Sequence, residues 1–267
     1  MRVRCPAKVN TFLSVGPRDA RGYHPIRTRF QAVGLFDELE VEPADEDTFA
    51  CDWPGLPAEN TVTKTLRLLR ELVNSPPLRI VLTKHIPVQA GLGGGSSDAA
   101  GLIRAFRQMY PEQTPDHFLS EVAEAVGSDV PFFLVGGRAE GTGYGERLKP
   151  LPDLPKEWML IVKPQESVST AEAYALLDGT DREWRPFGEE YFNDFERVAP
   201  CICGEISERL QVHGASAALL CGSGSAVFGV FDSEQSASQA KHQMAAEGFV
   251  ESWVVPTLTR EESLWTS

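Results

Sequence analysis

The 267-residue sequence lacks any uninterrupted apolar run near the roughly 20 residues that a membrane-spanning helix needs. Its first residues, Met1 to Pro6, contain no apolar targeting region either. These two absences argue against a membrane partner. They predict that the protein is located in the cytoplasm.

Positive charge is also scarce. The chain has 25 lysines and arginines against 38 aspartates and glutamates, which gives a formal net charge of −13. Because nucleic acids and anionic membranes bind basic surfaces, this balance predicts no nucleic-acid partner. An anionic ligand would need a local positive site, for which the candidates are backbone amides and Lys8, Arg27, Arg29 and Lys84.

The five cysteines form no disulfide or metal-binding pattern. Cys201 and Cys203 are too close together for a zinc knuckle, so we expect reduced thiols and leave any metal ligands unassigned. Two common nucleotide-binding motifs are missing as well. No Gly-Lys-Ser/Thr follows the glycines as in a P-loop, and the Rossmann glycine spacing is absent.

A glycine-rich segment over residues 87–100 is the most informative feature present. An alternating apolar pattern predicts a strand over residues 78–82 before it, and a helical pattern follows over residues 99–106. A helix that begins directly after such a loop offers free N–H groups and a positive dipole end, where polyanions bind. Ser96, Ser97 and Asp98 could instead simply cap the helix, but a cap needs no run of glycines, so the pattern favours a phosphate-binding loop.

The remaining pattern predicts an α+β protein of two domains. Three prolines between residues 150 and 155 mark a boundary, which gives domains over residues 1–152 and 153–267. In the first we expect strands over 9–15, 35–41 and 132–135, with helices beginning at Asn60 and at 114–115. In the second we expect helices over 192–210 and 233–247, a short helix from Thr170, and strands over 159–162, 217–221, 226–231 and 250–255. This order suits an antiparallel sheet with helices on one face.

Three separated segments together carry a resemblance to a known family. They are Pro6-Ala7-Lys8-Val9-Asn10, the glycine-rich loop, and residues 219–228 with their Gly222-Ser223-Gly224-Ser225 turn. In this order they resemble the GHMP small-molecule kinases. The resemblance implies a two-domain α+β fold with a ferredoxin-like C-terminal domain. It also implies ATP bound with Mg²⁺ at the loop residues Pro87, Val88, Gln89, Ala90, Gly91, Leu92, Gly93, Gly94, Gly95, Ser96 and Ser97.

Further segments resemble one branch of these kinases, namely residues 22–24, 90–100, 127–133 and 193–196. That branch acts on a cytidine diphosphate methylerythritol. The resemblance therefore implies ATP-dependent phosphorylation of the 2-hydroxyl of this small molecule, in non-mevalonate isoprenoid biosynthesis, by a monomer or a homodimer. Two other hypotheses remain open: a GHMP kinase for homoserine, mevalonate or a sugar, and a non-catalytic nucleotide-binding regulator.

The resemblance implies that Lys8 and Asp129 form the catalytic pair. Asp129 would accept the hydroxyl proton, and Lys8 would favour the ionised carboxylate and offset charge on the transferred phosphoryl group. From the residues alone, Asp129 could equally be a turn-forming aspartate ahead of a strand. Lys8 alone could be an ordinary surface lysine. The presence of both argues against the non-catalytic hypothesis.

An acceptor that carries a nucleobase needs an aromatic face and polar groups at the base edge. The resemblance implies that Tyr23, His24 and Phe30 hold the cytosine and that Asn10 contacts the methylerythritol end, while Tyr191 could add a second ring. Phe30 and Tyr191 could instead be core aromatics. The Gly222–Ser225 turn could likewise be only a tight hairpin, although in the resembled family it faces the active-site cleft.

Overall fold

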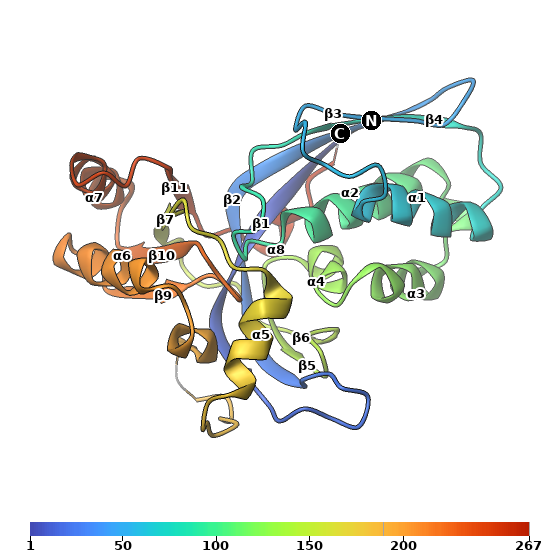
Figure 1. Ribbon diagram of the computed structural model, residues 1–267. Helices are drawn as coiled ribbons and strands as arrows, with labels where there is room; N and C mark the ends of the chain where they lie inside the picture. The colour runs from blue at the N-terminus through green and yellow to red at the C-terminus, as the bar shows by residue number, and fades with distance from the viewer. Residues whose placement is uncertain (189, 267) are drawn as a thin grey trace.

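Two β-sheets form the centre of the molecule in the computed structural model, which describes residues 1–188 and 190–266 (Figure 1). The first sheet has the strand order β3-β4-β2-β1-β8, and β5 and β6 extend it from β2. Its strands are β1 (Arg2–Val15), β2 (Ile26–Pro43), β3 (Thr48–Cys51), β4 (Leu78–Thr83), β5 (Arg138–Thr142), β6 (Arg147–Pro150) and β8 (Phe192–Asn193).

The second sheet has the order β11-β7-β10-β9, with every neighbouring pair antiparallel. Its strands are β7 (Trp158–Val162), β9 (Ala217–Leu220), β10 (Val227–Phe231) and β11 (Ser252–Pro256), and its helices are α6 (Cys201–Val212) and α7 (Glu234–Ala246). Along the chain these elements run β7-α6-β9-β10-α7-β11, which is the split βαβ arrangement of ferredoxin-like domains. The predicted α+β architecture is confirmed.

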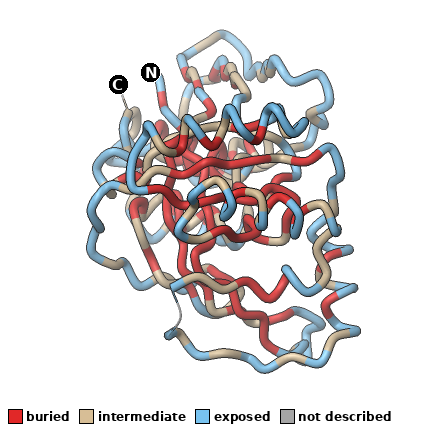
Figure 2. The backbone as a smooth tube through the Cα atoms, turned by 90° about the vertical axis from the view of Figure 1, so that its left-hand side faces the viewer, coloured by how far each residue is buried: buried red, intermediate tan, exposed pale blue. Residues whose placement is uncertain are grey.

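Four helices lie together beside the first sheet (Figure 1). They are α1 (Thr61–Leu72), α2 (Gly94–Met109), α3 (Asp116–Val126) and α4 (Val130–Val135). The buried residues of α2, among them Leu102, Ile103 and Phe106, pack against sheet residues such as Leu39 and Ile80 in one apolar core. Buried segments accordingly lie in the middle of the molecule and exposed ones in the outer loops (Figure 2).

A second apolar core lies between the two sheets. A β-bulge in β1 turns Ala7 and Val9 into this core. Side chains two residues apart on a strand share a face. Val3 and Cys5 pack in the helix-side core, but Ala7 and Val9 pack between the sheets with Met159. The pairing of β1 with β2 shifts register between Pro6 and Ala7, and this shift exchanges the two faces. It therefore turns the residues that alternate with Ala7 and Val9, namely Lys8 and Asn10, toward the helix side.

Two predicted elements are wrong. Residues 132–135 form the end of helix α4, not a strand; Pro131 lies in its first turn, and Phe132 and Phe133 are buried. A short apolar run does not distinguish a strand from a buried helix. Residues 192–210 are not one interrupted helix, because β8 and a 3₁₀ turn (Asp194–Arg197) precede α6. Phe192 and Asn193 instead pair in parallel with Phe12 and Leu13 of β1.

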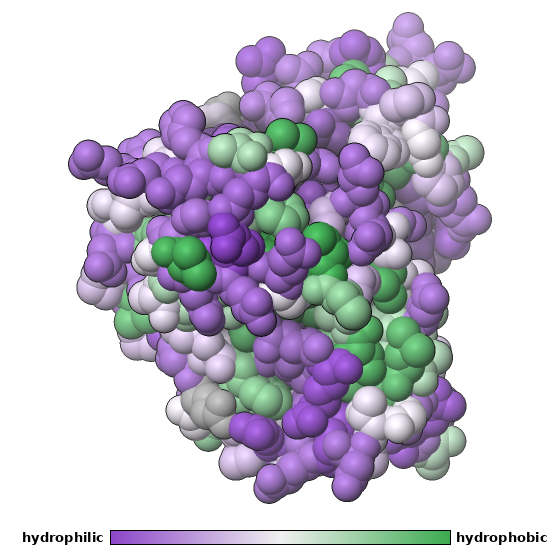
Figure 3. Space-filling model, turned by 60° about the vertical axis from the view of Figure 1, so that its left-hand side comes forward, coloured by the Kyte–Doolittle hydropathy of each residue, from purple (hydrophilic) through white to green (hydrophobic). Residues whose placement is uncertain are grey.

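The two ends of the described chain lie close together. Helix α8 (Arg260–Ser263) packs on β1 and β2, and Val3 bridges to Thr266 (Figure 1). The predicted boundary at residues 152 and 153 falls in the link between β6 and β7. Among the described residues, no helix has both the length and the apolarity to cross a membrane. The face drawn in Figure 3 is mostly hydrophilic, with apolar groups in patches.

Candidate active site

A cleft of about 500 Å³ receives side chains from both halves of the chain. One set of lining residues surrounds the glycine-rich loop and the start of α1. A second set comes from β1 and β2, from the turn between β5 and β6, and from α5 (Thr170–Asp178). The first set includes Leu56, Asn60, Thr61, Val62, Lys84, Ile86 and Pro87 to Ser96, and the second includes Asn10, Phe30, Tyr144, Thr170 and Tyr174.

The glycine-rich loop fits against its neighbours because it has no side chains at key positions. Gly91 has φ +77°, and a Cβ there would lie 1.9 Å from the carbonyl oxygen of Cys221. Gly93 has φ +73° and precedes the first residue of α2, and a Cβ there would lie 2.8 Å from Phe133. The loop therefore places the amino end of a 16-residue helix at the cleft with no side chain in the way. Of the predicted loop residues, Pro87 to Ser96 line the cleft and Ser97 is fully buried.

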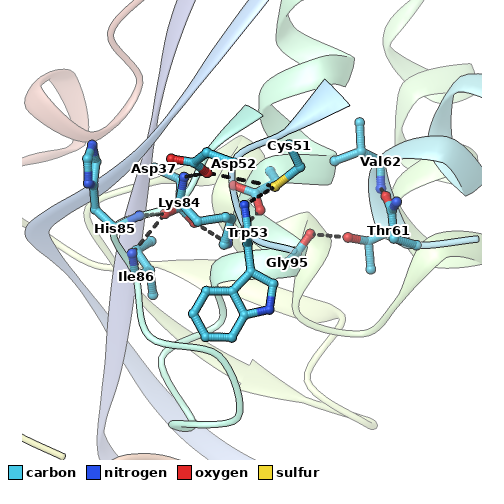
Figure 4. A network of polar contacts seen from close by, with 12 residues as sticks. Asp37, Cys51, Asp52, Trp53, Thr61, Val62, Lys84, His85, Ile86 and Gly95 are labelled. Carbon is cyan, nitrogen blue, oxygen red and sulfur yellow. Dashed lines mark hydrogen bonds and ion pairs between the residues drawn. The ribbon is translucent and has the colours of Figure 1, made fainter. Parts of the chain in front are cut away.

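A buried ion cluster lies at the base of this loop (Figure 4). Lys84 Nζ donates to Asp98 Oδ2 at 2.8 Å and also to Asp37. Asp37 Oδ1 accepts from the backbone N–H groups of His85 and Ile86 at 2.6 and 2.8 Å. Burial, and then the Asp37 charge, raise the pKa of Asp98 well above its usual value. The two aspartates that share this buried ammonium therefore tie β2, the end of β4 and α2 together at the base of the loop.

A hydroxyl at the start of α1 contacts the same loop. Asn60 caps α1 by accepting from the backbone N–H groups of Val62 and Thr63, and this places Thr61 at the cleft. Thr61 Oγ1 donates to the carbonyl of Gly95 at 2.7 Å (Figure 4). The predicted phosphate-binding loop is thus held by α1 through Thr61 and by the ion cluster through Asp98.

Lys8 and Asp129 meet in this cleft although they are far apart in the sequence. Lys8 Nζ lies 3.4 Å from Asp129 Oδ2, and the side chains are 5% and 30% exposed. Lys8 Nζ also donates to Asn10 Oδ1 at 2.8 Å, and Asn10 Nδ2 donates to Thr28 Oγ1 at 2.7 Å. The Lys8 backbone N–H donates to Leu92 O at 2.9 Å, so β1 is bonded directly to the glycine-rich loop.

The third glycine segment lies beside the same lysine. A Cβ on Gly222 would be 3.3 Å from Lys8 Nζ, which shows how closely this turn approaches. Asn193 Nδ2 donates to the carbonyls of Leu220 and Gly222 at 2.9 and 2.8 Å and sets the turn in place. Ser223 lines the cleft and exchanges a hydrogen bond with Thr170 of α5 at 3.1 Å.

The residues expected to hold the acceptor divide into two groups. Asn10 and Phe30 line the cleft, and the Phe30 ring lies 5.7 Å from Lys8 Nζ. Tyr23, His24 and Tyr191 are not among the cleft-lining residues. Tyr23 is 65% exposed, and Tyr191 packs at the edge of the core between the sheets.

His24 lies behind the cleft wall. Its Nδ1 is 2.9 Å from the carbonyl of Gly16, and its Nε2 is 3.1 Å from Asp178 Oδ1. The His24 ring stacks on Tyr174 at 5.3 Å, and Tyr174 itself faces the cleft. The structure therefore places an aromatic ring between the histidine and the cleft.

Sequence reasoning missed several lining residues. Leu56, Asn60, Thr61, Val62 and Ile86 were not expected at the site, and neither were Tyr144 and Tyr174. Two local signals could have indicated some of them. Asn60 is a helix-capping residue that ends a loop, and Tyr144 lies between two glycines.

The described residues contain no group of three or more histidines, cysteines, aspartates or glutamates that could bind a metal ion without other ligands. Oxygen atoms are nevertheless present at the loop. Ser96 lines the cleft, and Asp98 Oδ1 is buried with no hydrogen-bond partner. Such a set fits Mg²⁺, which keeps water ligands and is usually bound by one or two protein oxygens together with substrate phosphates.

Comparison with known proteins places the fold in one class. The GHMP kinases N terminal domain family matches residues 60–137, which span α1, the glycine-rich loop, α2 and Asp129. The GHMP kinases C terminal family matches residues 177–250. The crystal structure of a homoserine kinase from Cytophaga hutchinsonii has the same fold, with a TM-score of 0.72 over 97% of this chain and 94% of that chain at 19% identity. The chain is a GHMP kinase.

Closer relatives define the particular family. The 4-diphosphocytidyl-2-C-methyl-D-erythritol kinase of Desulfitobacterium hafniense is 33% identical over 95% of this chain and 94% of the relative. A crystal structure of 4-(cytidine 5'-diphospho)-2C-methyl-D-erythritol kinase matches with a TM-score of 0.81 at 34% identity, over 96% of this chain and 99% of that chain. This chain belongs to the 4-diphosphocytidyl-2-C-methyl-D-erythritol kinase family.

Proposed function

We propose that this chain transfers the γ-phosphoryl group of ATP to the 2-hydroxyl of 4-diphosphocytidyl-2-C-methyl-D-erythritol, giving the 2-phosphate and ADP. The reaction is a step of non-mevalonate isoprenoid biosynthesis, and we assign it to the cytoplasm because ATP is its co-substrate. The observation that carries the proposal is the meeting of Lys8 and Asp129 at 3.4 Å in a cleft that the glycine-rich loop also lines. The family membership of the chain supports the identity of the acceptor.

Phosphoryl transfer requires phosphates in line, an offset for their charge, and an acceptor for the hydroxyl proton. Within the predicted loop of residues 87–97, the backbone N–H groups of residues 88–96, which include the amino end of α2, bind the triphosphate. Asp129 accepts the proton as the acceptor oxygen bonds to the γ-phosphorus. The bond from that phosphorus to the β-phosphate bridging oxygen breaks, and ADP leaves with the electron pair.

Lys8 acts on the γ-phosphoryl group and on Asn10. Its side chain is only 5% exposed, so its charge is weakly screened by water and acts on nearby anions. It offsets charge on the γ-phosphoryl group during transfer, and its contact with Asn10 holds the amide where the methylerythritol end would lie. Mg²⁺ bound with ATP would neutralise phosphate charge, and Ser96 and Asp98, which line the cleft, would offer it protein oxygens.

The acceptor occupies the other set of lining residues. We propose that Asn10 and Phe30 contact it directly, while Tyr23, His24 and Tyr191 act at its cytidine end from outside the present cleft wall. We also propose that residues 1–152 and 153–267 are the two domains. The first supplies the phosphate loop and the second supplies the Gly222–Ser225 turn, and both approach Lys8.

One assay tests the function directly. Purified protein with ATP, magnesium and the acceptor should release ADP and form the 2-phosphate, identified by phosphorus NMR. Homoserine and mevalonate, which lack a nucleobase, should give no product at the same concentrations. Phosphorylation of either one in place of the cytidylyl acceptor would contradict the proposal.

A further inference from the structure

Tyr144 is a cleft-lining aromatic residue to which the proposed mechanism gives no role. It lies in the turn between β5 and β6, flanked by Gly143 with φ +73° and Gly145 with φ +115°. The backbone N–H of Ile26 donates to Gly143 O at 2.7 Å, and a Cβ on Gly145 would lie 3.7 Å from the carbonyl of Ser128. The turn is thus fixed to β2 and lies beside the residue that precedes Asp129.

The Tyr144 hydroxyl bonds to a carboxylate on a different loop. It donates to Asp19 Oδ2 at 2.5 Å. The other oxygen of Asp19 accepts from the backbone N–H groups of Arg21 and Tyr23, at 2.9 and 3.1 Å. A hydrogen bond from a hydroxyl to a carboxylate is short and stronger than one between neutral groups. Asp19 therefore organises the turn of residues 19–23 and bonds that turn to Tyr144.

The Tyr144 ring also contacts two side chains of the same turn. The Tyr23 ring lies 5.7 Å from the Tyr144 ring in a tilted arrangement, and the guanidinium carbon of Arg21 lies 4.9 Å from its centre. Tyr23 is mostly exposed and does not line the cleft, whereas Tyr144 is half-buried and does. Tyr144 thus stands between the cleft and the turn of residues 19–23, which is exposed from residue 20 onward.

We propose that Tyr144 determines specificity for the nucleobase of the acceptor: its ring forms the wall against which the cytosine lies, and its hydroxyl, through Asp19, positions the turn of residues 19–23 beside that wall. The proposal rests on the proposed function for the identity of the acceptor. It predicts a residue that acts on the binding of the cytidylyl group and not on the chemical step. The two parts of the side chain, ring and hydroxyl, can be removed separately.

The test uses the full chain and cytidine 5'-diphosphate as the probe, with affinity measured by titration calorimetry. Tyr144→Ala should weaken CDP binding about 10- to 100-fold, because stacking of one base on an aromatic ring contributes in that range. Tyr144→Phe keeps the ring but removes the hydroxyl. It should weaken CDP binding by about 3- to 10-fold, the effect of one hydrogen bond. Tyr110→Phe is the matched control, since Tyr110 lies at the end of α2 and outside the cleft, and it should bind CDP as the unaltered protein does.

Steady-state kinetics separate positioning from general damage. In both Tyr144 variants KM for the acceptor should rise with the CDP dissociation constant, while kcat and KM for ATP stay within about twofold. Asp19→Ala combined with Tyr144→Phe should be no worse than the more affected single variant, because both remove the same contact. A rise of KM for ATP in step with that for the acceptor would overturn the proposal by showing a merely structural role.

The two proposals fail in different ways. If the unaltered protein phosphorylates the acceptor but Tyr144→Ala leaves CDP affinity and acceptor KM unchanged, the role of Tyr144 is overturned and the proposed function stands. If the unaltered protein binds CDP in a Tyr144-dependent manner yet does not phosphorylate the acceptor, the proposed function is overturned and the nucleobase site stands.

Discussion

Replacement of Asp129 by asparagine is the most informative single change, because it keeps the shape of the side chain and removes its charge. Asp129 Oδ2 lies 3.4 Å from Lys8 Nζ, whose side chain is 5% exposed. An amide cannot accept the proton of the acceptor hydroxyl. A positioned general base contributes about 10²- to 10⁴-fold to rate, so kcat should fall by about that factor. This fall equals about 3–5 kcal/mol in the activation barrier.

The measurement is ADP release in a coupled assay, with ATP affinity determined separately by titration calorimetry. ATP binding should change little, because the backbone N–H groups of the glycine-rich loop bind the triphosphate. Asp45→Asn, at an exposed position outside the cleft, is the matched control and should keep full activity. A kcat for Asp129→Asn within about threefold of the unaltered enzyme would refute the assignment of the base.

Three further changes test the surroundings of the site. Gly91→Ala would place a methyl group 1.9 Å from the carbonyl of Cys221 at φ +77°; it should lower the free energy of unfolding by about 3 kcal/mol or more, measured by urea denaturation, and weaken ATP binding. Asn193→Ala removes two buried hydrogen bonds to the third glycine turn, and should cost about 2–4 kcal/mol in the same measurement. Arg209 lowers the pKa of Glu247 to about 2, chiefly through a side-chain hydrogen bond. The ionised Glu247 therefore stabilises the fold fully above its unfolded pKa near 4.5, and this contribution is lost as pH falls through 2. Glu247→Gln should accordingly show a smaller fall of Tm between pH 4.5 and pH 2 than the unaltered protein.

The glycine-rich loop and its flanking elements could be predicted because their signals are local. The alternating residues 78–82 form β4, and the glycines, the serines and the apolar period together indicate a loop that opens a helix. Most elements of the ferredoxin-like half could be predicted for the same reason, as Ser233 caps α7. The start of α6 is the exception, because residues 192–200 do not belong to a helix that continues into it.

The proximity of Lys8 and Asp129 could not be derived from local patterns. It depends on the register shift between Pro6 and Ala7, which turns Lys8 to the helix side, and on helix α4, which follows Asp129 directly. The short run of residues 132–135 has no period that distinguishes this helix from a strand. The resemblance to a kinase family indicated that Lys8 and Asp129 form a pair, and the fold explains why the two residues meet.

The acceptor end was harder to predict for a related reason. Which aromatic residue faces a cleft is decided by packing between loops that are distant in sequence. Tyr174 lies between His24 and the cleft, and Tyr144 lies between Tyr23 and the cleft. A turn residue flanked by glycines can be recognised in the sequence, but its partner Asp19 cannot, because the contact joins two separate loops.

The central claim is that phosphates bound at the glycine-rich loop are attacked beside Lys8 and Asp129, and a crystal structure with a non-hydrolysable ATP analogue and the cytidylyl acceptor tests it most directly. The account predicts the γ-phosphorus next to Lys8 Nζ and the acceptor 2-hydroxyl within about 2.6–3.2 Å of an Asp129 carboxylate oxygen. A triphosphate bound away from residues 87–97, or an acceptor hydroxyl out of reach of Asp129, would contradict it.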